Sequence, residues 1–253
     1  MSEMVRQWRQ ALQKRVVAVT GAGSGLGEAT ARAFAAAGCY LACLDINLPE
    51  LQRVGRELEE ASTEVLTCLC DVSQEAAVAE SVAAILGRWQ RLDILVNCAA
   101  VDHTLPVEEL SVGQWDQVLG VNLRGPFLLA RAVFPPMRAQ GGGHIINVAS
   151  TAALRAWANA SAYHASKWGL LGFSRGLSVE GRPYGIRVTT IIPGGMRTHF
   201  FDRFLAQGLP LPQEEQLQDP ATVAETIVFA ASLPPESALQ ELLVTPFNET
   251  SWP

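Results

Sequence analysis

A tyrosine and a lysine stand four residues apart in the segment YHASK, residues 163 to 167. On an α-helix, side chains at this separation lie on the same face, so we expect the Lys167 ammonium close to the Tyr163 phenol. A free phenol has a pKa near ~10, which makes it a weak base at neutral pH. A neighbouring cation favours the phenolate, so the pair is suited to donating and accepting a proton. The same spacing also arises by chance in many helices, so this interpretation depends on the rest of the chain.

A glycine-rich turn, TGAGSGLG at residues 20 to 27, connects a β-rich run to a helical stretch. Gly21 permits a sharp turn, Gly25 lets the backbone approach a pyrophosphate, and Gly27 permits close packing of helix and strand. The N–H groups at the start of the following helix would face the anion. A strand before the turn and a helix after it therefore predict a dinucleotide site.

Asp45 ends the second β-rich run, YLACLD at residues 40 to 45. At this place in a dinucleotide-binding fold, a carboxylate accepts hydrogen bonds from the ribose diol of the adenosine. The carboxylate would repel a 2′-phosphate, and neither Ala22 nor Ser24 offers a compensating cation. The sequence therefore predicts a preference for NAD(H) over NADP(H), although an acidic residue also ends many strands that bind no ligand.

Seven short β-rich runs alternate with helical stretches along the chain. Most of them are apolar without strict alternation, which is typical of strands buried on both faces of a parallel sheet. They occupy residues 15–20, 40–45, 64–70, 92–97, 144–149, 186–192 and 241–245. We expect an α/β Rossmann fold, a doubly wound parallel sheet of about seven strands with helices on both faces. No linker or repeat interrupts the pattern, so residues 1–253 are interpreted as one domain.

Local signals mark several element boundaries. Pro49 stands where a first helical turn would begin, and Ser73 and Ser111 are candidate N-caps. Three glycines at 141–143 break the chain before a strand. The least regular segment, residues 193–220, has paired glycines, four prolines and an aromatic cluster. It follows a predicted strand on the ligand-binding side of the sheet, so we interpret it as a substrate lid rather than a plain surface excursion.

Composition and charge exclude several classes of protein. Hydrophobic residues make up 49% and charged residues 17% of 253 residues, as expected for a folded globular protein. The formal charge of −6 and the lack of a basic run argue against nucleic-acid binding. We find no signal peptide and no run of 18 apolar residues, so we expect a cytoplasmic protein that does not bind a membrane.

The five cysteines are expected to be reduced thiols rather than a disulfide framework. Their number is odd, and most of them lie in apolar, strand-like segments. Cys68 and Cys70 would point to opposite faces of a strand, and no histidine stands at a ligand-like spacing from another. We therefore expect no metal site.

With these features the chain resembles the short-chain dehydrogenase/reductase family over nearly its whole length. The motifs that carry the resemblance are TGAGSGLG at 20–27, Asp71-Val72, NCAA at 97–100, Asn122 in GVNLRG, Ser150 in NVAS, YHASK at 163–167 and PGGMRT at 193–198. The resemblance implies an enzyme that interconverts a secondary alcohol and a ketone with NAD(H). It makes Tyr163 the catalytic acid and base, and Lys167 its activator and a ribose ligand. Ser150 would orient the carbonyl, and Asn122 would support a water relay to Lys167.

Two further groups of residues complete the expected site. Cofactor contacts, in addition to Tyr163 and Lys167, are expected from Gly21, Ser24, Gly25, Leu26, Gly27, Asp45, Asp71, Val72, Asn97, Ala99, Ala100, Pro193, Gly194 and Thr198. Substrate contacts are expected from Val101, Ala152, Trp157, Met196, His199 and Phe200. Apolar and aromatic types dominate the substrate group, and no Arg pair suited to a carboxylate or phosphate stands out. We therefore expect a small neutral or modestly polar hydroxyl compound as substrate.

The chain departs from the family pattern at two places. The turn that usually has the sequence NNAG is NCAA here, and the closing strand leads into TPFNETSWP where the family has an aspartate and glycines. Both departures affect local loop geometry and leave the catalytic group intact.

Other functions remain compatible with these motifs. A 3-oxoacyl-thioester reductase or a sugar or polyol dehydrogenase would use the same residues, because specificity depends on the variable loops. A nicotinamide-binding redox sensor or scaffold is disfavoured, since a sensor has no physical reason to keep the phenol, the ammonium and the hydroxyl together. The resemblance implies a homotetramer, or a homodimer, and residues 161–180 are too apolar for a fully solvated helix.

Overall fold

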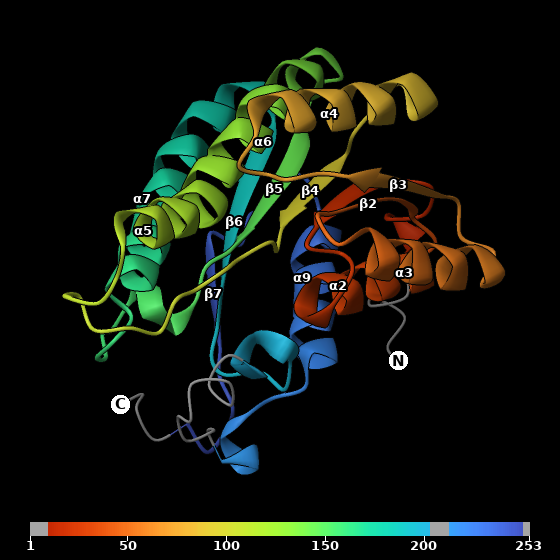
Figure 1. Ribbon diagram of the computed structural model, residues 1–253. Helices are drawn as coiled ribbons and strands as arrows, with labels where there is room; N and C mark the ends of the chain where they lie inside the picture. Colours follow the sequence, from red (N-terminus) through yellow and green to blue (C-terminus); the bar gives the residue numbers. More distant parts are fainter. Residues whose placement is uncertain (1–9, 203–212, 250–253) are drawn as a thin grey trace.

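The structure is a computed structural model that describes residues 10–202 and 213–249. Its centre is a seven-stranded parallel sheet with the strand order β3-β2-β1-β4-β5-β6-β7 (Figure 1). The strands are β1 Val16–Thr20, β2 Tyr40–Asp45, β3 Val65–Leu69, β4 Ile94–Asn97, β5 Gly143–Val148, β6 Ile186–Pro193 and β7 Glu241–Val244. The order runs outward in both directions from β1 and β4, which defines a doubly wound Rossmann sheet. The predicted fold class is confirmed.

Helices cover both faces of this sheet (Figure 1). One face carries α2 Gly25–Ala36, α3 Leu48–Glu60 and α9 Pro220–Ser232, and the other carries α4 Glu75–Trp89, α5 Val112–Leu119, α6 Gly125–Ala139 and α7 Ser161–Gly181. Shorter helical turns are η1 Gly120–Arg124, η2 Thr151–Ala153, η3 Arg182–Tyr184, η4 His199–Phe201 and η5 Glu214–Gln216. Val17 packs into one core with Phe34 and Ile227, whereas Leu95 packs into the other with Leu129. Burial on both faces explains why the central strands are apolar throughout.

The predicted helix and strand boundaries agree with the structure at most places. Pro49 lies in the first turn of α3. Ser111 caps α5 in a capping box, because its hydroxyl accepts the Gln114 N–H while the Gln114 side chain accepts the Ser111 N–H. Gly141 and Gly142 have φ values of +87° and +147° and form the turn between α6 and β5.

The prediction that Ser73 caps a helix was wrong. The N-cap of α4 is Gln74. Ser73 instead belongs to the preceding turn, where its N–H and its hydroxyl both donate to Oδ1 of Asp71, at 2.9 and 2.7 Å. Asp71 Oδ1 thus holds Ser73 in the preceding turn through both groups, and the helix begins one residue later.

The described residues also bear on membrane, metal and disulfide chemistry. Within residues 10–202 and 213–249, no helix is both long and apolar enough to span a membrane. In the same ranges, three or more His, Cys, Asp or Glu side chains nowhere gather as a metal site would require. All five cysteines are free thiols.

Candidate active site

The glycine turn between β1 and α2 forms a cradle at the carboxyl end of the sheet. Gly21 and Gly25 have φ values of +66° and +54°, a region that favours glycine. A Cβ on Gly21 would lie 3.0 Å from Ala99 Cα, and a Cβ on Gly27 would lie 1.9 Å from the Gly21 carbonyl oxygen. The missing side chain of Gly21 lets the turn approach Ala99, and that of Gly27 lets the turn fold onto its own helix. The first turn of α2, Gly25 to Gly27, lines the cavity, and the N–H groups at a helix start suit an anion.

The NCAA turn after β4 lies against this cradle. The hydroxyl oxygen of Thr20 accepts the N–H groups of Cys98 and Ala99, each at 3.1 Å. Cys98 lines the cavity wall, and burial raises the pKa of its thiol to about 12, so the thiol is neutral. The departure from the family pattern therefore leaves a turn that is held firmly by the first strand.

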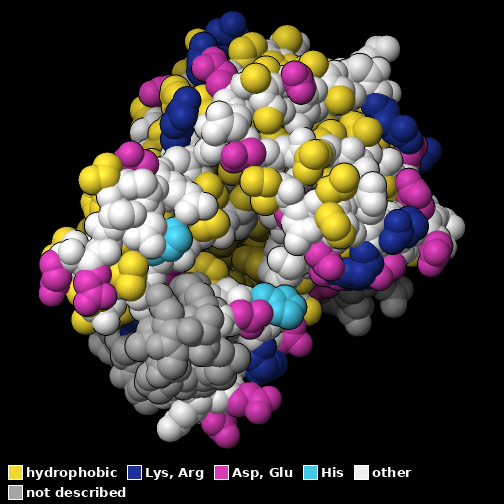
Figure 2. All heavy atoms as spheres, in the orientation of Figure 1, with side chains coloured by type: hydrophobic (Ala, Val, Ile, Leu, Met, Phe, Trp, Pro, Cys, Tyr) yellow, Lys and Arg dark blue, Asp and Glu magenta, His cyan; other side chains and the backbone are white. Residues whose placement is uncertain are grey.

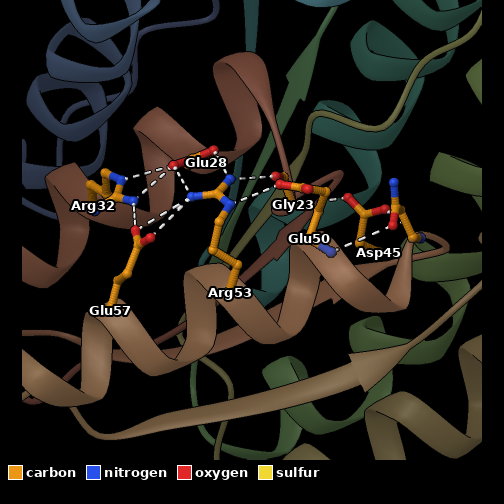
Figure 3. Close-up of polar contacts among 8 residues, drawn as sticks. Gly23, Glu28, Arg32, Asp45, Glu50, Arg53 and Glu57 are labelled. Carbon is orange, nitrogen blue, oxygen red and sulfur yellow. Dashed lines mark hydrogen bonds and ion pairs between the residues drawn. The ribbon is translucent and has the colours of Figure 1, made fainter.

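Asp45 presents its carboxylate beside the glycine turn (Figure 3). Its Oδ2 accepts the Gly23 N–H at 2.8 Å, and its Oδ1 accepts the Asn47 N–H at 2.8 Å. Each carboxylate oxygen can accept a second hydrogen bond, and Asp45 lines the cavity. The backbone thus fixes the carboxylate and leaves it able to accept two hydroxyl groups of a ligand.

Two arginines near this turn are neutralised by carboxylates (Figure 3). Arg53 donates to Glu28 and Glu50, each at 2.8 Å, and to the Gly23 carbonyl oxygen at 3.3 Å. Arg32 pairs with Glu28 and Glu57. Hydrogen bonds to Glu28 and Glu50 raise the pKa of Arg53 above its usual range. These cations are therefore engaged with the protein's own acids.

Tyr163 and Lys167 lie one turn apart on α7, and the Lys167 Nζ is 5.6 Å from the centre of the Tyr163 ring. Lys167 is 2% exposed, and its ammonium donates to the Val148 carbonyl oxygen at 2.8 Å. Burial lowers the pKa of Lys167 to about 8. The predicted proximity of the two side chains is present, and the ammonium is held at the carboxyl end of β5.

Ser150 follows β5 and faces the same cavity as Tyr163. Its hydroxyl oxygen accepts the Ala152 N–H at 3.1 Å. A hydroxyl that already accepts a backbone N–H keeps its own proton for donation to another acceptor. Ser150 can therefore donate a hydrogen bond to an oxygen atom of a substrate.

A cavity of about 1170 Å³ joins the glycine turn, Asp45 and the side chains of Ser150, Tyr163 and Lys167. Figure 2 shows this face of the molecule hollowed near its centre, with hydrophobic side chains at the bottom of the hollow. The residues expected from the sequence that line the cavity are Gly21, Ser24, Gly25, Leu26, Gly27, Asp45, Asp71, Val72, Ala99, Ala100, Val101, Ser150, Trp157, Tyr163, Lys167, Pro193, Gly194, Met196, Thr198, His199 and Phe200. Residues far apart in the sequence thus meet at one edge of the sheet.

Three expected site residues lie behind the cavity wall. Asn97 donates to Asn147 Oδ1 at 2.7 Å and so connects β4 to β5 inside the core. Ala152 is fully buried and packs against Tyr163. Asn122, in the π-helical turn η1, is fully buried as well. These three residues support the wall and do not contact its inner surface.

Asn122 connects one wall of the cavity to α7. Its Oδ1 accepts the Val101 N–H and its Nδ2 donates to the Val101 carbonyl oxygen, both at 2.8 Å. The same Nδ2 donates to Ser166 Oγ at 3.0 Å, one residue before Lys167. The side chain is therefore committed to positioning, and the expected water relay stays a prediction.

The two ends of the 193–220 segment lie side by side. Met196 forms a β-bridge with Gln218, whose N–H donates to the Gly195 carbonyl oxygen at 3.0 Å. Phe200 lies over Tyr163, with ring centres 5.6 Å apart. Residues 203–212, which the predicted lid includes, lie outside the described residues, so the lid stays a prediction.

Sequence reasoning missed several charged residues of the cavity wall, and two of them form an ion pair. Arg155 and Glu249 form an ion pair at 3.2 Å, with side-chain exposures of 18% and 14%. Both line the cavity. The sequence shows Arg155 shortly after Ser150 and Glu249 in the divergent C-terminal stretch, but nothing in it indicates that the two side chains meet. The cavity is consequently less apolar than expected.

Comparisons with known proteins agree with this geometry. The sequence model of the short chain dehydrogenase family matches residues 15–207. D-threitol dehydrogenase of Mycolicibacterium smegmatis is 41% identical over 182 residues, which are 72% of this chain and 70% of that protein. The crystal structure of levodione reductase has a TM-score of 0.86 at 30% identity, covering 95% of this chain and 99% of that one. The crystal structure of a metagenomic short-chain oxidoreductase in complex with NADP has a TM-score of 0.82 at 32% identity, covering 93% and 98%.

The chain belongs to the short-chain dehydrogenase family, whose members are oxidoreductases. The resemblance inferred from the motifs is confirmed at the level of the family.

Proposed function

We propose that the protein is an NAD(H)-dependent oxidoreductase that interconverts a secondary alcohol and a ketone. The observation that carries the proposal is the shared cavity, which has Ser150, Tyr163 and Lys167 at one part of its wall and the glycine turn with Asp45 at another. A proton-transfer group and a dinucleotide cradle are the two parts that such a reaction requires.

The residues present fit a nicotinamide dinucleotide. The cradle at Gly27 leaves no room for a Cβ, and the start of α2 offers N–H groups to a pyrophosphate. Asp45 would hold the adenosine ribose, and Tyr163 and Lys167 would hold the ribose next to the nicotinamide. Asp71 and Val72 would flank the adenine, and Pro193, Gly194 and Thr198 would contact the nicotinamide carboxamide. When bound, the cofactor supplies the hydride acceptor or donor.

The side chains of this chain perform the proton chemistry. During oxidation Tyr163, as the phenolate favoured by the Lys167 ammonium, takes the hydroxyl proton of the alcohol while the hydride leaves the carbon. During reduction the Tyr163 hydroxyl gives that proton to the carbonyl oxygen. Ser150 donates a hydrogen bond to the same oxygen as negative charge develops on it. Trp157 and Phe200, which line the cavity, help to exclude water.

Asp45 supports the choice of NAD(H). Its carboxylate, fixed by the N–H groups of Gly23 and Asn47, would repel a 2′-phosphate. Arg53 and Arg32 are already paired with Glu28, Glu50 and Glu57, so neutralising a 2′-phosphate would require breaking these pairs. A solved relative is in complex with NADP, so the cofactor preference of this chain is tested directly.

The test compares Asp45→Ala and Asp45→Asn with the wild-type protein, using kcat/KM for NADH and NADPH. Asp45→Asn keeps a carbonyl oxygen for the backbone and removes the charge. If repulsion sets the preference, both variants should shift the NADH/NADPH ratio of kcat/KM by about tenfold or more toward NADPH. An unchanged ratio in both variants would contradict the assignment of Asp45.

We further propose a small neutral substrate with a second oxygen near the reacting carbon, such as a polyol or a cyclic hydroxyketone. Two relatives carry the names D-threitol dehydrogenase and levodione reductase. The Arg155–Glu249 pair offers donors and acceptors to such a second oxygen. Turnover of polyols, cyclic hydroxyketones and 3-hydroxyacyl thioesters with NAD⁺ separates the candidates. Preference for the thioesters would favour a 3-oxoacyl-thioester reductase, and NADH binding without any turnover would favour a sensor.

We also propose a homotetramer. Phe127 and Trp168, 45% and 53% exposed, lie on the helical face formed by α6 and α7. Phe229 and Leu243, 43% and 37% exposed, lie on α9 and β7. Two separate apolar faces allow two kinds of isologous contact, which together close a tetramer. Light scattering of the purified protein tests this assembly, and a monomer would contradict it.

Residues 1–253 are proposed to act as one domain in the cytoplasm. One sheet takes its strands from Val16 to Val244, which supports a single unit. Five free thiols suit a reducing compartment. Single-step unfolding in denaturant and fractionation of cells would test the two statements.

A further inference from the structure

His164 follows Tyr163 on the catalytic helix and makes a pair of hydrogen bonds that the proposed mechanism does not use. Its ring is buried, with 9% exposure. The ring atom Nδ1 lies 2.9 Å from the Ala152 carbonyl oxygen, and Nε2 accepts the Trp157 N–H at 3.1 Å. One side chain of α7 therefore contacts both the turn after Ser150 and the segment that carries Trp157.

The chemistry of the two partners determines the protonation of the ring. A carbonyl oxygen only accepts, so Nδ1 must carry the hydrogen that it shares with Ala152. A backbone N–H only donates, so Nε2 must be unprotonated towards Trp157. His164 is therefore neutral and has its hydrogen on Nδ1. A second proton on Nε2 would point at the Trp157 N–H and break that contact.

Each hydrogen bond of His164 leads to a different part of the substrate site. The carbonyl oxygen of Ala152 accepts from His164 Nδ1, and the N–H of the same residue donates to Ser150 Oγ at 3.1 Å. On the other side, the Trp157 ring packs edge-on against the His164 ring, with centres 4.4 Å apart. Trp157 lines the cavity and is 46% exposed. The donor side of the ring thus reaches the Ser150 hydroxyl, and the acceptor side reaches the Trp157 wall.

We propose that His164 is a positioning residue that holds Ser150 and Trp157 in register with Tyr163. Its Nδ1–H sets the orientation of the Ser150 hydroxyl through Ala152, and its Nε2 sets the substrate wall through Trp157. The hydrogen bond from Nδ1 therefore affects the chemical step, and the hydrogen bond to Nε2 affects the fit of the substrate. This inference rests on the proposed function, because the roles of Ser150 and Tyr163 belong to it.

Two substitutions separate the two hydrogen bonds. In His164→Asn, the amide nitrogen replaces Nδ1 and can still donate to Ala152, but nothing replaces Nε2. In His164→Gln, the amide oxygen replaces Nε2 and can still accept from Trp157, but the donor to Ala152 is lost. We expect His164→Asn to raise KM about tenfold with kcat within about twofold, and His164→Gln to lower kcat about tenfold with KM within about twofold.

Controls distinguish positioning from a general loss of stability. His164→Phe keeps a ring and removes both hydrogen bonds, so it should show both defects together. His144, at the far end of β5, is also buried, with 2% exposure. Its Nε2 forms a hydrogen bond with Thr189 Oγ1 at 2.8 Å. His144→Asn should lower the melting temperature and leave kcat and KM within about twofold. If His164→Asn and His164→Gln behave like His144→Asn, or change kcat and KM in the same way as each other, the inference is wrong.

A measurement without turnover keeps the inference separate from the proposed function. In ¹⁵N NMR spectra of the wild-type protein, the His164 ring should have a protonated Nδ1 and an unprotonated Nε2. The Trp157 amide resonance should move in His164→Asn and stay near its place in His164→Gln. If the wild-type protein gives these spectra but shows no turnover, the proposed function is refuted. The hydrogen-bond geometry of His164 would still stand. A protonated Nε2 would overturn the inference whatever the activity.

Discussion

The carboxyl and amino ends of the same parallel strands use their polar side chains in different ways. At the carboxyl ends, Asp45 and Ser150 each accept backbone N–H groups and keep hydrogen-bonding capacity that faces the cavity. At the amino ends, Asp93 accepts the Val16 N–H and the guanidinium groups of Arg15 and Arg91. The first arrangement leaves hydrogen-bonding capacity for a ligand, whereas the second is satisfied within the protein.

Arg187 extends the pattern at the amino ends. Its guanidinium donates to the carbonyl oxygens of Leu233, Pro234 and Ser237, at 2.9 to 3.2 Å, and so ties β6 to the loop after α9. A buried polar group that is satisfied within the protein contributes to stability, and one that retains capacity in a cavity is suited to binding. The comparison predicts that substitutions at the carboxyl ends change kcat or KM, whereas substitutions at the amino ends change the free energy of unfolding.

The largest effect is expected at the carboxyl end, in Ser150→Ala. The variant removes the hydroxyl that donates to the developing oxyanion, so kcat should fall about a hundredfold or more, equivalent to about 3 kcal/mol. The melting temperature should stay close to the wild-type value, because the lost hydroxyl accepts only one N–H group. Steady-state kinetics and thermal unfolding check the two halves of this prediction. If Ser150→Ala kept full activity and lost stability, Ser150 would behave like the polar residues at the amino ends, which contradicts the comparison.

Asp93→Asn should produce the opposite result at the amino end. Burial alone would raise the pKa of Asp93, but hydrogen bonds from Arg91, the Val16 N–H and Arg15 together outweigh it, so the pKa is lowered. Loss of the charge should lower the free energy of unfolding by about 2 to 3 kcal/mol. Denaturant unfolding measures this change, with kcat and KM expected to remain within about twofold. A large loss of kcat at unchanged stability would show that the two ends are coupled.

His144 provides a pH test of the amino end. Burial lowers the pKa of His144 to about 3, from 6.5 for an exposed histidine. The unfolded chain therefore takes up a proton below about pH 6.5 that the folded protein does not, so stability falls with decreasing pH by about 1.4 kcal/mol per pH unit from this group. His144→Gln lacks the titration, and its free energy of unfolding should fall less steeply between about pH 6 and pH 4.5. Equal slopes for the variant and the wild type would refute this account.

The smallest effect is expected from the ion pair in the cavity wall. Glu249→Gln keeps an oxygen for Arg155 and removes the charge, so KM for a polyol should rise about threefold to fivefold with kcat little changed. Glu241→Gln is the matched control, because Glu241 pairs with Arg175 at 2.6 Å on the surface. If both variants leave KM unchanged, Arg155 and Glu249 do not contribute to substrate binding.

The sequence predicted the fold well because its signals were local. Apolar runs identify the strands, and the glycines at 21, 25 and 27 identify the turn after β1. Tyr163 and Lys167 were found together because a helix converts a spacing of four into proximity. The Ser73 prediction failed because the Asp71 carboxylate accepts both the N–H and the hydroxyl of Ser73 and holds it in the preceding turn, which residue type alone does not reveal.

Contacts between distant segments were beyond the reach of the sequence. Arg155 and Glu249 are 94 positions apart (249 − 155) and meet only when the C-terminal segment folds against the turn after β5. Asn97 was expected to contact the cofactor and Ala152 the substrate, yet the direction of their side chains depends on packing between strands and α7. The hydrogen bonds of His164 likewise depend on the path of residues 150–157. Such features follow from tertiary structure and have no local pattern.

The most direct test of the account is kcat of Tyr163→Phe with NAD⁺ and a polyol or cyclic hydroxyketone that the wild-type protein turns over. The variant loses the phenolic hydroxyl and keeps the ring beside Phe200 and Lys167. We predict a loss of about two orders of magnitude or more in kcat, with NADH binding nearly intact. A variant that retains kcat within about threefold of the wild type would contradict the assignment of Tyr163 as the proton-transfer group.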